Sequence, residues 1–159
     1  MTPVLGGRLQ TRWFTTLVFA VPWTIAVAWL LPKPVGGTTA EMYELTLKMV
    51  LMLGLLGTGW ELVYHGLQQL RWDKDWPSIF GLAAVVPEGL LLWYVGHWTG
   101  ILPGTTDWSD APLRDAFLIH VLTTWLVVWL SLQGPMRILA FRWRFEGGQV
   151  IPVRRPRDW

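Results

Sequence analysis

Residues 45–101 read LTLKMVLMLGLLGTGWELVYHGLQQLRWDKDWPSIFGLAAVVPEGLLLWYVGHWTGI, which is two apolar runs on either side of a charged turn at residues 71–77. Each run is long enough to cross a bilayer, which takes about 20 residues of α-helix. Trp72 and Trp76 bracket the turn, and tryptophan concentrates at membrane–water interfaces. This stretch therefore predicts two transmembrane helices joined by a short polar connection.

Composition points the same way for the whole chain. Of its 159 residues 52% are hydrophobic and 15% are charged, and 13 are tryptophan. Such a chain is too apolar for an ordinary soluble protein and too short for two sizeable domains. The absence of cysteine excludes disulfides, thiolate metal sites and cysteine nucleophiles. The sequence also has no phosphate-binding loop, serine-hydrolase elbow or zinc-protease motif, so we expect a non-catalytic protein without a bound metal.

Two further apolar runs flank the central stretch. The first follows Arg8 and Arg12 and has Pro22 near its middle, where we expect a kink. The last begins after a polar loop and stops at residues 133–135, Gln-Gly-Pro. We therefore predict an all-α membrane protein whose single domain, residues 1–135, contains four transmembrane helices at about 13–31, 45–67, 78–101 and 113–132.

Residues 136–159 form a basic tail. Residues 141–145 alternate apolar and charged side chains, residues 146–148 have the composition of a turn, and residues 149–153 are suited to a returning strand. The pattern predicts a short β-hairpin. We expect the tail arginines to bind anionic lipid headgroups or an acidic partner, and not nucleic acid, because no nucleic-acid motif accompanies them: Arg137, Arg142, Arg144, Arg154, Arg155 and Arg157.

Basic residues predict the orientation. With the N-terminus in the cytoplasm, ten basic residues fall on the inner side: Arg8, Arg12, Arg71, Lys74 and the six tail arginines. Three fall outside: Lys33, Lys48 and Arg114. Because positive charge is enriched in cytoplasmic segments, we expect both termini in the cytoplasm, in a bacterial inner membrane.

Two carboxylates lie at hydrocarbon depth, where a charge is costly. Glu61 is four residues before His65, so the two share one helical face; they are candidates for a proton relay or a metal, or they simply satisfy each other during packing. Glu88 follows Pro87 and precedes Gly89 near mid-membrane. An acid beside a helix break is found in transporters, and it also occurs where a kink needs polar repair. We expect Glu61 and Glu88 to face each other or a common polar partner.

Small residues and histidines complete the candidates. Gly54, Gly57, Thr58 and Gly59 predict a helix face that another helix approaches closely. His97 and His120 fall at similar depths near the opposite surface. That placement suits one haem between two helices, and interfacial histidines are the ordinary alternative.

Three functions remain open from the sequence. The first is a non-catalytic subunit or scaffold of a larger membrane complex, whose partners are the lipid bilayer and other subunits or a second copy. The second is conduction or transport of protons or small ions through Glu88 and Glu61. The third is a redox subunit that binds haem or a quinone.

Overall fold

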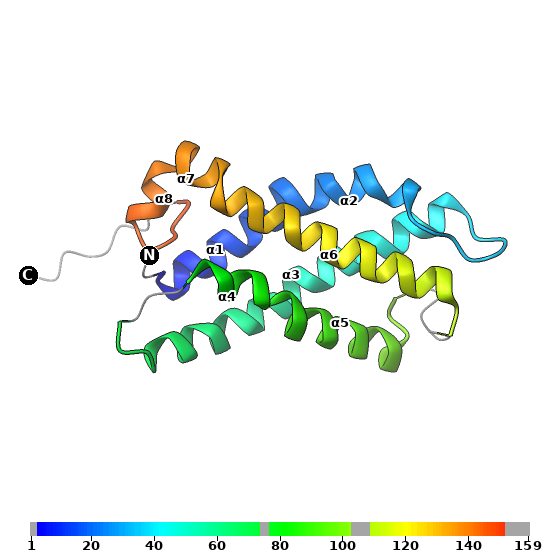
Figure 1. Cartoon of the computed structure of the whole chain (residues 1–159), viewed down its shortest axis with the longest axis horizontal. Helices are drawn as coiled ribbons and strands as arrows, with labels where there is room; N and C mark the ends of the chain where they lie inside the picture. The colour runs from blue at the N-terminus through cyan, green and yellow to red at the C-terminus, as the bar shows by residue number, and fades with distance from the viewer. Residues whose placement is uncertain (1–2, 74–76, 103–108, 152–159) are drawn as a thin grey trace, which may run out of the picture.

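The structure is a computed structural model that describes residues 3–73, 77–102 and 109–151. In these ranges the chain is helical and contains no strand. Four helical segments are long and apolar enough to cross a membrane, as expected of an integral membrane protein: Leu5–Leu30, Thr39–Gln69, Ser78–Thr99 and Ala111–Leu139. They lie lengthwise beside one another (Figure 1).

The first segment is built from four pieces: α1 (Leu5–Thr15), a π-helical turn η1 (Thr16–Ala20), α2 (Val21–Val27) and a final 3₁₀ turn η2 (Ala28–Leu30). Pro22 lies at the start of α2 and has no N–H to donate to the preceding turn, so the irregular turn stands at the predicted kink. From Thr16 onward every fourth residue is buried: Thr16, Ala20, Thr24 and Ala28. The buried Arg8 lies eight residues before Thr16, on the same pattern.

The second segment is the single helix α3 (Thr39–Gln69). It begins with a capping box in which the Thr38 hydroxyl accepts from the Glu41 N–H and the Glu41 carboxylate accepts from the Thr38 N–H. Lys48 and Glu44 form an ion pair on its surface at 2.7 Å. The helix is longer than the predicted 45–67, because its polar first and last turns extend beyond the apolar run.

The third segment divides into α4 (Ser78–Ala83) and α5 (Val85–Thr99). The interruption is at Ala84, before the Pro87-Glu88-Gly89 site that the sequence indicated. Its cause is still Pro87, which has no N–H to donate to the carbonyl of Ala83 one turn earlier. Gly100, at a φ of 63°, ends α5 in the left-handed conformation that glycine adopts readily.

The fourth segment is α6 (Ala111–Gln133), followed by the short helices α7 (Pro135–Leu139) and α8 (Phe141–Phe145). The predicted hairpin is therefore wrong: residues 141–145 are helical, and the rings of Phe141 and Phe145 are in contact one turn apart, with their centroids at 4.8 Å. Residues 146–148 do form a turn. Residues 149–151 are not a strand, and residues 152–159, with Arg154, Arg155 and Arg157, lie outside the described ranges.

The α7–α8 segment packs onto the start of α1, so both lie at one end of the bundle together with the end of α3 and the start of α4 (Figure 1). The Val4 N–H donates to the Gly147 carbonyl at 2.9 Å, and the Trp143 indole N–H donates to the Thr11 hydroxyl at 2.7 Å. The Gln10 side-chain carbonyl accepts from the N–H groups of Val150 and Ile151. The chain therefore holds this part of its own tail in place.

The two halves of the bundle differ in their interiors. Toward the opposite end lies an apolar core contributed mainly by α3, α5 and α6: Leu31, Met42, Leu45, Met49, Leu53, Leu92, Leu102, Leu113, Ala116, Phe117 and Val121. Toward the α7–α8 end the buried side chains include charged and amide groups, among them Arg8, Gln68 and Glu88. The asymmetry places the polar chemistry of the protein in one half of the bundle.

Candidate intramembrane ion-pair site

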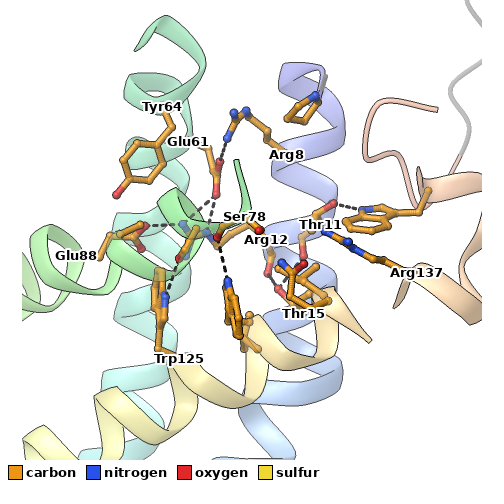
Figure 2. Close-up of a pocket in the computed structure, with 18 residues that line it drawn as sticks. Arg8, Thr11, Arg12, Thr15, Glu61, Tyr64, Ser78, Glu88, Trp125 and Arg137 are labelled. Carbon is orange, nitrogen blue, oxygen red and sulfur yellow. Dashed lines mark hydrogen bonds and ion pairs between the residues drawn. The ribbon is translucent and has the colours of Figure 1, made fainter. Parts of the chain in front are cut away.

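Arg8 and Arg12 are one helical turn apart on α1 and enter the bundle. The sequence predicts both before the first span, as charges flanking the membrane. In the structure both lie within the first helix, because that helix begins at Leu5 and not near residue 13. Arg8 is only 7% exposed, and both guanidinium groups point toward α3 (Figure 2). A buried arginine requires anionic partners, and α3 and α5 supply them.

Arg12 joins the two intramembrane acids. Its Nε and Nη2 lie 3.1 and 2.9 Å from Glu61 Oε1, and Nη2 lies 2.7 Å from Glu88 Oε1. Figure 2 shows the guanidinium between the two carboxylates. Glu61 and Glu88 therefore share a polar partner, which is one of the two arrangements expected from the sequence. Such charge-assisted hydrogen bonds are roughly twice as strong as neutral ones.

Arg8 extends the cluster by one turn. Its Nη1 lies 3.2 Å from Glu61 Oε2, so Glu61 accepts from both arginines. Its Nε and Nη2 donate to the side-chain oxygen of Gln68 at 3.2 and 2.8 Å. Two arginines and two glutamates thus form a network whose charges balance, which is the condition under which ions are tolerated away from water. We call Arg8, Arg12, Glu61 and Glu88 the ion-pair cluster.

Packing fixes the geometry of the cluster. Gly57 lies directly beneath Arg12, and a Cβ on Gly57 would stand 2.7 Å from the guanidinium carbon. On the other side, that carbon is 5.5 Å from the centroid of the Trp125 ring on α6, a cation–π distance. The indole N–H of Trp125 donates to the Gly81 carbonyl at 2.9 Å. Arg12 is therefore held between the glycine face of α3 and an oriented tryptophan.

Glu88 is the more deeply buried acid, with 2% of its surface exposed. It lies in the first turn of α5, directly after the interruption at Ala84. Tyr64, one turn after Glu61 on α3, points toward it (Figure 2). The site is thus built from α1, α3 and α5, and the helix break controls where α5 presents its carboxylate.

A cavity of about 200 Å³ adjoins the cluster. The ion-pair cluster and Tyr64 line one part of it, and small side chains of α1, α4 and the interruption at Ala84 leave the space open: Thr11, Thr15, Ser78, Gly81 and Ala84. The rest of the lining comes from residues of α6, with Arg137 of α7 and Trp143 of α8. The cavity therefore lies in the polar half of the bundle, next to both carboxylates.

The other predicted residues are scattered. His65 is partly buried on α3, and no contact joins it to Glu61 in the described residues. Gly54 packs against Trp13 and Thr16, whereas Gly59 faces open space. The Thr58 hydroxyl donates to the Gly54 carbonyl within α3. Two of the four predicted packing residues, Gly54 and Gly57, thus serve contacts inside this chain.

His97 and His120 have different surroundings. His97 is exposed on α5, whereas His120 is fully buried on α6 with its Nε2 3.0 Å from the Thr24 hydroxyl oxygen. Haem ligation by this pair stays a prediction. Across the described ranges, no three histidine, aspartate or glutamate side chains converge as a metal site would require.

The tail arginines that the structure describes are at the surface. Arg137, Arg142 and Arg144 are exposed, among exposed apolar side chains of α7 and α8 that include Ile138, Leu139, Phe141 and Phe145. A mixture of this kind suits the boundary between headgroups and acyl chains.

The sequence reasoning missed Arg8 and Arg12, the central residues of the site. Their four-residue spacing was a usable signal, because it is the same spacing that placed Glu61 and His65 on one helical face.

No family model, curated protein or solved structure matches this chain.

Proposed function

We propose that this protein is a non-catalytic integral membrane protein that binds and moves protons or a small ion at Glu88 and Glu61. The observation that carries the proposal is the attachment of the buried Glu88 and the half-buried Glu61 to Arg12 beside a cavity in the polar half of the bundle. Intramembrane acids that border a cavity are a recurring feature of ion and proton pathways.

Ion binding at the cluster has a direct structural consequence. With Glu88 ionised, the charges of the two arginines and the two glutamates cancel. A proton on Glu88 removes the charge that attracts Arg12 at 2.7 Å and leaves one positive charge in excess. Attraction over such a distance is strong where water is excluded, so protonation loosens the contact between α1 and α5. We expect α5 to move relative to α4 at the interruption at Ala84 when this contact loosens.

Buried polar side chains continue beyond the cluster along the contact between the first segment and α6: Thr15, Thr16, Thr24, His120 and Thr124. His120 Nδ1 and Thr124 Oγ1 are buried without a hydrogen-bond partner in the described part of the chain. Hydroxyl and imidazole groups are the usual carriers in a proton relay, and they support a path toward the opposite end.

The test is proton flux into liposomes that contain the purified protein and a trapped pH dye, driven by a potassium diffusion potential. Glu88→Gln keeps the size of the side chain but does not titrate, so we expect the flux to fall by at least about tenfold. The matched control is Glu44→Gln, at an exposed glutamate that pairs with Lys48 far from the cavity. Unchanged flux in folded Glu88→Gln protein, verified by circular dichroism and gel filtration, would refute the proposal.

A second candidate is a subunit or scaffold of a larger membrane complex. Gly59 and Gly66 on α3 favour it, because both face open space seven residues apart and would let another helix approach. The remaining support is reduced, since Gly54, Gly57 and the described part of the tail make contacts within the chain. Light scattering in several mild detergents tests it, and a stable monodisperse monomer in all of them would contradict it.

We propose further that both termini are cytoplasmic, in a bacterial inner membrane. With Arg8 and Arg12 counted inside the bundle, eight basic residues remain on the proposed inner side against three outside, so the bias persists. Because the chain has no cysteine, Val35→Cys and Gln149→Cys each introduce a single label site. In intact cells an impermeant maleimide should label residue 35 and not residue 149, and the reverse pattern would invert the topology.

A further inference from the structure

The lining of the cavity beside the ion-pair cluster indicates that the cavity binds a ligand larger than a proton. Its charged lining comprises the ion-pair cluster and Arg137. The four cluster residues compensate one another, as the distances between them show. The Arg137 backbone N–H donates to the Gly134 carbonyl, but its guanidinium has no hydrogen-bond or ion-pair partner within the part of the chain that the structure describes. The lining therefore has one uncompensated positive charge, on α7.

The cavity lining around Arg137 contains both polar and apolar side chains. Gln133, Ser78 and Thr11 supply hydrogen-bonding groups, and Val128 and Leu132 supply an aliphatic wall. Figure 2 shows Arg137 directed from α7 toward the cavity. A ligand that satisfies both kinds of side chain needs an anionic group and an apolar body.

The aromatic part of the lining is held in position. Trp125 and Trp129 donate their indole N–H groups to the carbonyls of Gly81 and Ser78, at 2.9 and 3.0 Å. With these N–H groups occupied, the two rings offer mainly carbon surface to the cavity. Gly81 and Ser78 have too little side chain to fill the space on their side, which explains why it stays open.

We propose that this cavity binds a small amphipathic anion, whose phosphate or carboxylate pairs with Arg137 and whose apolar body lies between Trp125 and Trp129. The one uncompensated charge in the lining, on Arg137, is positive, so this part of the cavity favours an anion. A volume of about 200 Å³ is below that of a pocket for a drug-sized ligand, so it fits a headgroup with a short chain. The inference concerns binding alone and does not depend on proton movement.

The test is isothermal titration calorimetry of the full chain in dodecyl maltoside with hexyl phosphate as the probe. Inorganic phosphate supplies the anion alone and hexanol the chain alone, and we expect each to bind at least about tenfold more weakly than hexyl phosphate, because each satisfies only one kind of side chain in the lining. Equal affinity for hexyl phosphate and hexanol would overturn the proposal, and so would equal affinity for hexyl phosphate and inorganic phosphate.

Variants distinguish the cavity from general attraction to a basic surface. Arg137→Gln should weaken hexyl phosphate binding at least about tenfold, as expected for loss of a charge-assisted contact. Arg142→Gln is the matched control, since Arg142 is exposed on α8 and does not line the cavity. Equal losses in both variants would refute the site. Both positions are exposed, so neither replacement removes a buried contact.

The natural source of the anion is either a lipid headgroup or a soluble amphiphile. Nanodiscs of phosphatidylcholine alone are compared with nanodiscs that also contain phosphatidylglycerol. If phosphatidylglycerol weakens hexyl phosphate binding to the native chain but not to Arg137→Gln, the cavity is a site for an anionic lipid. Equal binding in both discs supports the cavity as a site for a soluble anion. Equal competition in the native chain and Arg137→Gln would count against the site.

Discussion

Arg12→Met removes the cation that holds the site together while preserving most of its length. Glu61 then keeps Arg8 at 3.2 Å, but Glu88 loses the arginine at 2.7 Å and stays buried. Loss of one partner from a buried ion pair costs about 3–5 kcal/mol, because the remaining charge is uncompensated. We expect the free energy of unfolding to fall by that amount.

A second replacement separates the charge effect from lost packing. Arg12→Met with Glu88→Gln leaves Arg8 and Glu61 as a balanced pair, so we expect the double variant to recover about 2–3 kcal/mol relative to the sum of the single variants. Arg71→Met is the control: its ion pair with Asp73 is exposed and contributes about 0–1 kcal/mol.

The assay is unfolding in mixed micelles of dodecyl maltoside and increasing dodecyl sulfate, followed by far-ultraviolet circular dichroism. A loss for Arg12→Met no larger than that for Arg71→Met would show that the cluster does not stabilise the bundle. Strictly additive effects of Arg12→Met and Glu88→Gln would show that the two side chains do not interact.

Two pairs of glycine replacements test the packing around the site. Gly57→Ala places a methyl group against the Arg12 guanidinium and should lower the free energy of unfolding by about 1–3 kcal/mol in the same assay. Gly59→Ala is the control: its methyl group faces open space, so the replacement should be neutral or stabilising by up to about 1 kcal/mol, and equal effects of the two replacements would contradict the close approach at Gly57. Gly7→Ala directs its methyl group into the backbone of the tail turn and should release the tail, seen as faster amide hydrogen exchange over residues 141–151, while Gly6→Ala should leave exchange unchanged. Slow exchange in both variants would show that the tail does not depend on this contact.

Much of the architecture follows from the sequence because hydropathy and helix length are local properties. The four segments, the kink at Pro22 and the disturbance before Glu88 all come from composition and proline chemistry within one turn of each site. The prediction that Glu61 and Glu88 share a partner came from matching depths. These features need no knowledge of how the helices rotate about their axes.

Arg12 could not be identified as the shared partner without knowing how the helices rotate about their axes. A hydropathy window treats a charged residue as the end of a span, so Arg8 and Arg12 were assigned to the flank and not to the helix. Their burial depends on Gly57 and Trp125, which come from other helices and become neighbours only after folding. The prediction of a hairpin failed for a related reason: alternation over five residues is too short to distinguish a strand from a helical turn that brings the rings of Phe141 and Phe145 into contact.

The π-helical turn Thr16–Ala20 also determines which insertions and deletions the first segment can accept. At 3.6 residues per turn, a feature repeated every four residues drifts around a helix by about 40° per repeat. One additional residue in the wide turn cancels about 100° of that drift, so Arg8 and Thr24 both stay directed at their neighbours. Deletion of a single residue there would restore a regular helix and leave the two halves in nearly the same relative orientation, because the extra residue of the wide turn adds no net rotation. A deletion elsewhere in the segment would instead rotate one half by about 100°, so selection should tolerate the loss of a residue in this turn better than at other positions of the segment.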